Sequence, residues 1–243
     1  MLTITPRDPG RPLIQATFRK REWLIIGKGG GIVKRYDFIE IGTSDFDTII
    51  QRPVAVGLRG LSVDPVHEYL ERLPDLPNVK KVCGGISKVG GKSHVHYIDP
   101  EVFSANPSLP KWLKGCNCIG GPHVHALSEI QKLGLGEETF LKVEVRLLTF
   151  CDLVEEYEVG SVDCIKIDAE GMDLEIVESW LAACEEFPDR PGLFAEIVIM
   201  ESNSFDRHRC PRFLELKSRL SNQGYGCHFI TGNDVMFRKG RFI

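Results

Sequence analysis

The chain lacks a long hydrophobic run, a strong excess of one charge and a recognisable leader. No apolar run is long enough to cross a bilayer. The 243 residues carry 30 basic and 34 acidic side chains, a formal net charge of −4, which leaves no electrostatic footprint for nucleic acid or a membrane surface. The first ten residues have no apolar core of a signal peptide. We therefore expect a cytoplasmic protein with neither a membrane nor a nucleic-acid partner.

The sequence also lacks a disulfide framework and a recognisable zinc pattern. Several of its eight cysteines fall inside expected strands or helices, which is typical of reduced core residues in a cytosolic protein: Cys83, Cys151, Cys164 and Cys184. Soft ligands gather at Cys116 and Cys118 with His123 and His125, but their spacing matches no common structural zinc site. A histidine that contacts the substrate or acts as a general base is the better interpretation.

From residue 36 onward, strand and helix patterns alternate. Apolar runs predict strands, and apolar residues at helical spacing predict helices between them. The strands are expected at 38–41, 59–63, 79–82, 141–148, 162–167 and 192–200, and the helices at 65–73, 149–157, 173–183 and 212–220. This alternation predicts an α/β fold with a mostly parallel sheet and right-handed crossovers. A closing hairpin at 227–238 predicts one antiparallel strand at the end.

Two segments fall outside this alternation. Residues 1–35 are expected to form an N-terminal extension, and the glycine loop at 27–31 lacks the lysine and hydroxyl order of a phosphate-binding loop. Residues 88–139 are rich in Gly, Pro, Asn and His. Since a stretch this long inside a compact domain is more often functional than idle, we expect an insertion in the 36–243 domain that covers the active site.

The first candidate site is a turn after the first strand. Glu40 ends that strand, Gly42 makes the turn, and Asp64 follows at the end of the second strand. In doubly wound folds such a turn lets backbone approach a nucleoside-bearing cofactor, while the second acid takes the ribose hydroxyls. A dinucleotide fingerprint wants three glycines, and this turn has one, so the pattern argues against NAD or FAD. The alternative is a plain strand–turn–helix connection with a chance acid downstream.

The second candidate site is a group of three charged residues at the carboxyl end of a buried strand. Lys166, Asp168 and Glu170 occupy one short stretch, at the sheet edge where ligands bind. The alternative is an internal ion pair of Lys166 that caps the next helix. Glu196 lies in the next apolar strand, and we expect its carboxylate to face the same cleft. Asp168 and Glu196 would then hold Mg²⁺ together, or one of them would accept a proton from a substrate hydroxyl.

In this order the motifs resemble the FkbM family of S-adenosylmethionine-dependent methyltransferases, over about residues 36–237. The matching stretches are 38–42, 63–65, 78–87, 143–153 and 195–197, and most specifically 163–171, Asp-Cys-Ile-Lys-Ile-Asp-Ala-Glu-Gly. The resemblance implies a class I methyltransferase (Rossmann-like) sheet of seven strands with the last antiparallel. It also implies methyl transfer to a hydroxyl of a small molecule or a sugar.

The resemblance implies where the cofactor binds, and the chemistry of the charged residues suggests the catalytic roles. The cofactor, S-adenosylmethionine, is expected at Glu40, Gly42, Thr43, Asp45, Asp64, Pro65 and Ser87, with Asp64 on the ribose. We expect Asp168 to be the catalytic base, Glu196 its partner, and Lys166 and Glu170 to orient them. The sequence departs from the family at Phe46, where a second glycine is usual, and at Asp64, where glutamate is usual.

Three other functions stay open at this point. The chain could be a nicotinamide oxidoreductase on a similar sheet, which the sparse glycines disfavour. It could be a non-catalytic descendant that binds the cofactor or a partner protein, which Phe46 favours if its ring closes the pocket. It could also be a methyltransferase that acts on a macromolecule such as a glycan or RNA. The near-neutral charge disfavours RNA.

Overall fold

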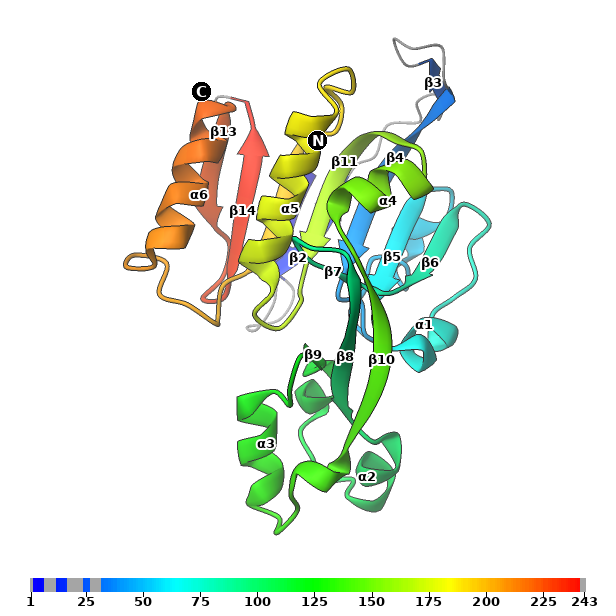
Figure 1. Ribbon diagram of the computed structural model, residues 1–243, viewed down its shortest axis with the longest axis vertical. Helices are drawn as coiled ribbons and strands as arrows, with labels where there is room; N and C mark the ends of the chain where they lie inside the picture. The colour runs from blue at the N-terminus through cyan, green and yellow to red at the C-terminus, as the bar shows by residue number, and fades with distance from the viewer. Residues whose placement is uncertain (1, 7–11, 17–23, 27–31, 241–243) are drawn as a thin grey trace.

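The computed structural model describes residues 2–6, 12–16, 24–26 and 32–240, and the glycine loop at 27–31 lies outside this part of the chain. The main sheet has the order β13-β14-β12-β11-β4-β5-β6 (Figure 1). In that order the strands are Tyr225–Phe229, Asp234–Lys239, Ile197–Glu201, Val159–Ile167, Ile32–Ile41, Gly60–Asp64 and Val79–Cys83.

The strands of this sheet are mostly parallel. Strand β4 pairs in parallel with β5 and β11, β5 with β6, and β11 with β12. Strand β14 is antiparallel to both of its neighbours, so β13 again runs in the direction of β12. The predicted α/β fold with a mostly parallel sheet and a closing hairpin is therefore confirmed.

The sheet begins earlier in the chain than expected. Strand β3, Leu24–Ile26, pairs antiparallel with β4, and β4 itself starts at Ile32. The expected domain boundary after residue 35 therefore falls inside a central strand. Two further strands, β1 (Leu2–Pro6) and β2 (Pro12–Ala16), pair antiparallel with each other in a separate sheet.

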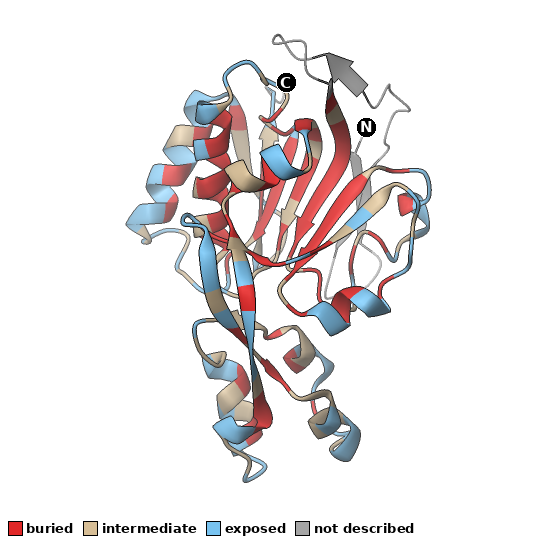
Figure 2. Cartoon of the chain, turned by 45° about the vertical axis from the view of Figure 1, so that its right-hand side comes forward, coloured by how far each residue is buried: buried red, intermediate tan, exposed pale blue. Residues whose placement is uncertain are grey.

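Three helices pack in contact along the sheet: α4 (Phe150–Glu156), α5 (Asp173–Glu186) and α6 (Pro211–Asn222). Helix α5 buries Leu174, Val177 and Leu181, as their spacing predicted, and Trp180 lies fully buried beside them. The indole Nε1–H of Trp180 donates to the carbonyl of Leu193 at 2.9 Å, so the ring keeps a partner inside the core. This main core joins the helices to the central strands (Figure 2).

Residues 91–148 form an arm that projects from the sheet (Figure 1). Its spine is the antiparallel pair β8 (Gly91–Ile98) and β10 (Phe140–Leu148), in a second sheet with β7 (Gly85–Ile86) and β9 (Cys118–Ile119). Helices α2 (Pro100–Ala105) and α3 (Val124–Gln131) and the 3-10 turns Lys111–Gly115 and Glu137–Thr139 lie between the two spine strands.

The expected insertion is thus a folded unit, and the strand predicted at 141–148 belongs to it instead of to the main sheet. The outer part of the arm has its own apolar cluster, formed by Ile98, Leu109, Leu113, Cys116, Ala126, Ile130 and Phe140. At the base, Val95, Tyr97 and Val145 pack against Val66 and Tyr69 at helix α1, His67–Arg72. The 3-10 turn Pro53–Ala55 completes the short elements. Within the described residues, no helix is long and apolar enough to span a membrane.

Candidate functional site

The site lies where three neighbouring strands end. Strands β4, β5 and β11 deliver Gly42, Asp64 and Asp168 to the same edge of the sheet, because parallel strands end together. Gly42 has φ +78°, and a Cβ there would lie 1.8 Å from the carbonyl oxygen of Asp168. Only glycine fits a backbone that is both left-handed and so close to its neighbour. The turn after β4 and the acid after β11 are thus built against each other.

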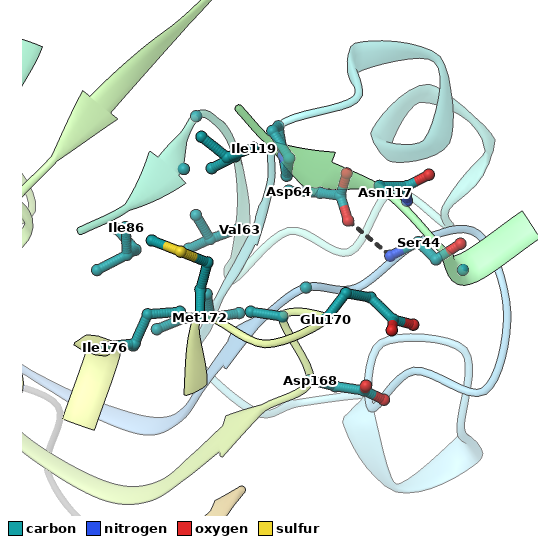
Figure 3. A pocket seen from close by; sticks show the side chains of 17 residues that line it. Ser44, Val63, Asp64, Ile86, Asn117, Ile119, Asp168, Glu170, Met172 and Ile176 are labelled. Atoms are coloured by element: carbon teal, nitrogen blue, oxygen red, sulfur yellow. Dashed lines mark hydrogen bonds between the residues drawn. The ribbon is translucent and has the colours of Figure 1, made fainter. Parts of the chain in front are cut away.

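A narrow cavity of about 40 Å³ opens beside this turn (Figure 3). Asp64 ends β5 on its wall, where it is 1% exposed and accepts hydrogen bonds from the N–H groups of Ser44 at 2.7 Å and Val66 at 2.8 Å. Burial raises the pKa of Asp64 to about 6, against the lowering effect of these N–H donors. At neutral pH the cavity therefore holds a carboxylate.

The rest of this first cavity is mostly apolar or backbone. Its further lining residues are Ile41, Gly42, Val63, Pro65, Gly84, Gly85, Ile86, Gly115, Asn117, Ile119, Asp168, Ala169, Glu170, Met172 and Ile176. A nucleoside-binding site needs a carboxylate for the ribose, apolar side chains for the base and glycines that let backbone approach, and this lining has all three. The Ser44 hydroxyl also lines it and is buried without a hydrogen-bond partner among the described residues. The residues present fit an adenosine group.

A larger cavity of about 410 Å³ adjoins the first. One oxygen each from Asp168, Glu170 and Glu201 lies within 4.8 Å of the other two. Burial, followed by repulsion from Asp168 and Glu170, raises the pKa of Glu201 to about 8. The remaining lining residues are Gly42, Thr43, Ser44, Phe46, Asp47, Trp112, Gly115, Cys116, His123, His125, Lys166, Asn203 and Asn233.

A buried ion pair supports the floor between the strands. Lys166 and Glu40 are direct neighbours in the β4–β11 register, and the Lys166 Nζ lies 2.9 Å from Glu40 Oε1. Burial alone would lower the pKa of Lys166, but Glu40 and then Asp168 outweigh it and raise the pKa. Glu40, fully buried, also accepts the Ile49 N–H at 2.8 Å. Lys166 therefore stays charged and fixes the base of the cavity.

The turn after β11 is strained at Glu170. This residue has φ +47°, an unusual conformation for a side chain other than glycine or asparagine, and Gly171 follows at φ +100°. Such strain persists where the surrounding structure imposes it, often at functional sites. His123 of the arm supplies one constraint, because its Nε2 lies 3.3 Å from Glu170 Oε2. The Cys118 thiol of β9 reaches the Glu170 carbonyl at 3.8 Å and supplies a second.

The structure corrects the expected role of Glu196. In the β11–β12 register, Cys164 pairs with Ile197 and Ile167 with Met200, so the start of β12 lies beside the middle of β11. Glu196 precedes that start and is exposed, whereas Glu201 ends the strand beside Asp168. The predicted Mg²⁺ pair of Asp168 and Glu196 is therefore wrong, because the two side chains lie at opposite ends of parallel strands.

Three of the expected cofactor residues do not line either cavity: Glu40, Asp45 and Ser87. Glu40 is held by the ion pair beneath the site. Asp45 accepts from Lys114 of the arm at 2.7 Å and Arg72 of α1 at 3.1 Å, so it joins the turn to both. The Ser87 hydroxyl donates to the Val89 carbonyl at 2.7 Å. Each of these three side chains lies outside the cavities and supports the backbone around them.

The other expected residues do reach the cavities. Gly42, Asp64 and Pro65 line the first cavity, and Thr43, Lys166, Asp168 and Glu170 line the second. Phe46 also lines the second cavity, so it does not close the first. A Cβ on Gly115 of the arm would come within 3.2 Å of the Phe46 ring.

Sequence reasoning missed Glu201, Trp112, Asn203 and the arm residues that cover the first cavity. Glu201 carried a readable signal, because it directly follows the apolar run Ile197–Met200 just as Asp168 follows Ile167. The arm residues had no such signal in the sequence, because their position depends on the orientation of the spine strands β8 and β10 relative to the sheet edge.

Two groups of side chains have the spacing of metal ligands. The first is Asp168, Glu170 and Glu201, and the second is Cys116, His123 and Glu170, each with its ligand atoms within 4.8 Å of one another. The first set offers oxygen only, which suits Mg²⁺ or Ca²⁺, and the second offers sulfur and nitrogen, which suits Zn²⁺. All eight cysteines are free thiols, and burial, followed by Glu170, raises the pKa of Cys116.

A model of the methyltransferase FkbM domain matches residues 80–227, more than half of the chain. The chain belongs to the FkbM methyltransferase family. The matched part of this FkbM protein includes the whole arm and strands β11 and β12, whereas the Gly42 turn and Asp64 precede it. Membership implies a methyltransferase, for which S-adenosylmethionine is the general methyl donor. No curated protein and no solved structure matches the chain.

Proposed function

We propose that the protein is an S-adenosylmethionine-dependent O-methyltransferase that acts on a hydroxyl of a small molecule or a sugar. The observation that carries this proposal is a shared wall. Five residues line both cavities: Gly42, Ser44, Gly115, Asp168 and Glu170. A donor in the first cavity and an acceptor in the second would therefore meet at one place, which is what a direct group transfer needs.

The sheet supports the same proposal. Strands β6, β5, β4, β11, β12, β14 and β13 follow the order of a class I methyltransferase sheet, with β14 as the antiparallel strand. In that arrangement the cofactor lies over the ends of the β4 and β5 equivalents. Both cavities lie at that edge.

The residues of the first cavity would hold the cofactor. Asp64 would accept hydrogen bonds from the ribose hydroxyls, and Ile86, Ile119 and Met172 would enclose the adenine. When bound, S-adenosylmethionine supplies an electrophilic methyl group on a sulfonium ion. The narrowness of the cavity means that the arm residues Gly115, Asn117 and Ile119 must yield for the nucleoside to enter.

The residues of the second cavity would activate the acceptor. An alcohol is a poor nucleophile, so a base must take its proton as the new bond forms. Asp168 is our candidate because it lines both cavities, where the hydroxyl and the transferred methyl group would meet. The Lys166 Nζ lies 4.0 Å from Asp168 Oδ2, so a cation stands beside the candidate base. Trp112, His125 and Asn203 would shape the rest of the acceptor site.

The first test is binding. Calorimetric titration with S-adenosylmethionine, S-adenosylhomocysteine and NAD⁺ should show binding of the two sulfur compounds only. Binding of NAD⁺ alone would favour an oxidoreductase. Failure of all three would favour a non-catalytic descendant.

The second test is a substitution at the base. In Asp168→Asn the affinity for S-adenosylhomocysteine should stay within about threefold, while turnover of a hydroxylated acceptor, found by screening with labelled methyl donor, should fall about 10²–10⁴-fold. Glu196→Gln, at the opposite sheet edge, is the matched control and should keep full activity. An equal loss of cofactor affinity and turnover in Asp168→Asn would contradict its role as base.

A further inference from the structure

The carboxylates of the second cavity are spaced for one ion. Oxygens that bind Mg²⁺ lie about 2.1 Å from it, and those that bind Ca²⁺ about 2.3–2.6 Å, so two ligands on opposite sides stand about 4–5 Å apart. The oxygens of Asp168, Glu170 and Glu201 lie within 4.8 Å of one another. The three oxygens are therefore close enough to converge on a single ion after small adjustments of their side chains.

The acidic groups of this set outnumber the cationic groups beside them. The Lys166 Nζ forms an ion pair with Glu40 Oε1 at 2.9 Å and lies farther, 4.0 Å, from Asp168 Oδ2. Glu201 Oε2 is buried, and among the described residues it has no hydrogen-bond partner. Buried carboxyl oxygens are normally hydrogen-bonded or coordinate a metal. The cavity therefore attracts a cation.

A neutral oxygen points to a ligand independently of the acids. Thr43 is 2% exposed and lines the same cavity, and its hydroxyl is buried without a partner within the described part of the chain. Buried hydroxyls in folded proteins are nearly always hydrogen-bonded, so the partner of this one is an occupant of the cavity, such as a water held at a bound ion.

The tautomer of His123 argues against metal binding by the alternative set, Cys116, His123 and Glu170. The Ala126 N–H donates to Nδ1 of His123 at 3.3 Å, which places the ring proton of the neutral imidazole on Nε2. That Nε2–H faces Glu170 Oε2 at 3.3 Å and has no lone pair for a metal. His123 instead orients Glu170, as hydrogen-bond partners of ligating carboxylates commonly do.

We infer that Asp168, Glu170 and Glu201 bind a divalent cation that prefers oxygen ligands, such as Mg²⁺ or Mn²⁺, with His123 as a positioning residue for Glu170. The role of the ion rests on the proposed function. An acceptor oxygen held at the cation becomes more acidic, so its proton passes more readily to the free oxygen of Asp168. The binding of the ion does not rest on that function.

The test uses Mn²⁺ as the probe and two variants, one at each end of β12. Calorimetric titrations of Mn²⁺ into the wild type, Glu201→Gln and Glu196→Gln, each saturated with S-adenosylhomocysteine, should give one site. Its Kd should be unchanged in Glu196→Gln and at least tenfold weaker in Glu201→Gln. Mn²⁺ should raise the melting temperature of the wild type and Glu196→Gln, but not that of Glu201→Gln. The metal-free melting temperatures of all three show that each is folded.

Several results would overturn the inference. A sample that binds S-adenosylhomocysteine but neither Mn²⁺ nor Mg²⁺ would refute the cation and leave the proposed methyl transfer intact. Failure of S-adenosylhomocysteine to bind would count against the methyl transfer instead, and Mn²⁺ titrated alone would then still decide the cation site. Unweakened binding in Glu201→Gln would refute the ligand set. Loss of binding in Cys116→Ser, expected to bind normally, would favour the sulfur and nitrogen set.

Discussion

Gly42 shows how a single residue can join two strands at a functional edge. Its left-handed backbone turns the chain away from β4, and its missing side chain leaves space for the carbonyl of Asp168. The sequence predicted a glycine turn for the cofactor. The contact with Asp168 is a second requirement for glycine at this position, because the backbone of residue 42 also fixes the position of the candidate base.

Substitution of Gly42 can be compared with a glycine that has only the backbone requirement. Gly57 has φ +89°, and a Cβ there would meet nothing within 4 Å. Gly57→Ala should therefore lower the free energy of unfolding by about 1–2 kcal/mol, because alanine disfavours the left-handed backbone. Gly42→Ala should lose more, on the order of 4 kcal/mol, because backbone must also move. Urea unfolding of both variants measures the difference, and equal losses would contradict the packing role.

Single residues also mark where sequence reasoning succeeds. Gly42, Asp64 and Asp168 lie at the sheet edge where the sequence placed them, because strand ends and turns have local signatures. Glu196 was misassigned because an apolar run shows that a strand exists but not where it starts. The strand was expected to start at residue 192 and starts at Ile197, and this error of five residues exchanged an acid at one sheet edge for an acid at the other.

At the scale of elements, the arm is the feature that the sequence could not specify. Its periodicity is weak because α2 and α3 are short and its turns many. Strand β10 was recognised, but its partner was not, since pairing between β8 and β10 closes a long loop that local patterns do not encode. The alternation of the main sheet was predictable because buried parallel strands are continuous apolar runs.

The arm can be shortened without cutting the main core. Tyr97 and Leu141 are direct partners in the spine, so replacing residues 98–140 by Asn-Gly should close a tight hairpin there. The replacement removes the outer cluster as a whole and keeps the base contacts of Val95, Tyr97 and Val145. We expect a folded protein, checked by circular dichroism and a cooperative melt.

This shortened protein should separate the two cavities. Affinity for S-adenosylhomocysteine should fall about tenfold, or ~1.4 kcal/mol, because the arm supplies only part of the first cavity. Methyl transfer should be lost, because Trp112, Cys116, His123 and His125 leave the second cavity. Full activity of the shortened protein would refute the arm as a cover for the acceptor.

At the scale of the whole molecule, Asp64 ties folding to pH. Burial raises its pKa from the ordinary 3.8 to about 6 in the folded state. The folded protein thus binds a proton there that the unfolded chain releases, and this contribution makes stability fall as pH rises from about 4 to about 6. The N–H groups of Val66, Ser44 and Thr43 and the Asp45 carboxylate are the polar groups that act on it.

Replacing Asp64 with a residue that does not titrate should reduce the pH dependence of the free energy of unfolding. In Asp64→Asn the loss of about 3 kcal/mol between pH 4 and pH 7 that Asp64 causes should be absent. Urea unfolding of both proteins at several pH values gives the difference between the curves, in which other groups cancel. A difference that does not change with pH would show that Asp64 titrates normally in the fold.

The roof of the first cavity has a kinetic consequence. Gly115, Asn117 and Ile119 close the nucleoside side, and Gly115 borders the acceptor side as well. Under the proposed function, a spent cofactor would leave only when the roof lifts, and lifting it would also open the space where the methylated product lies. Product release and cofactor exchange would then be one event, and the frequency of that opening would set the upper limit on turnover.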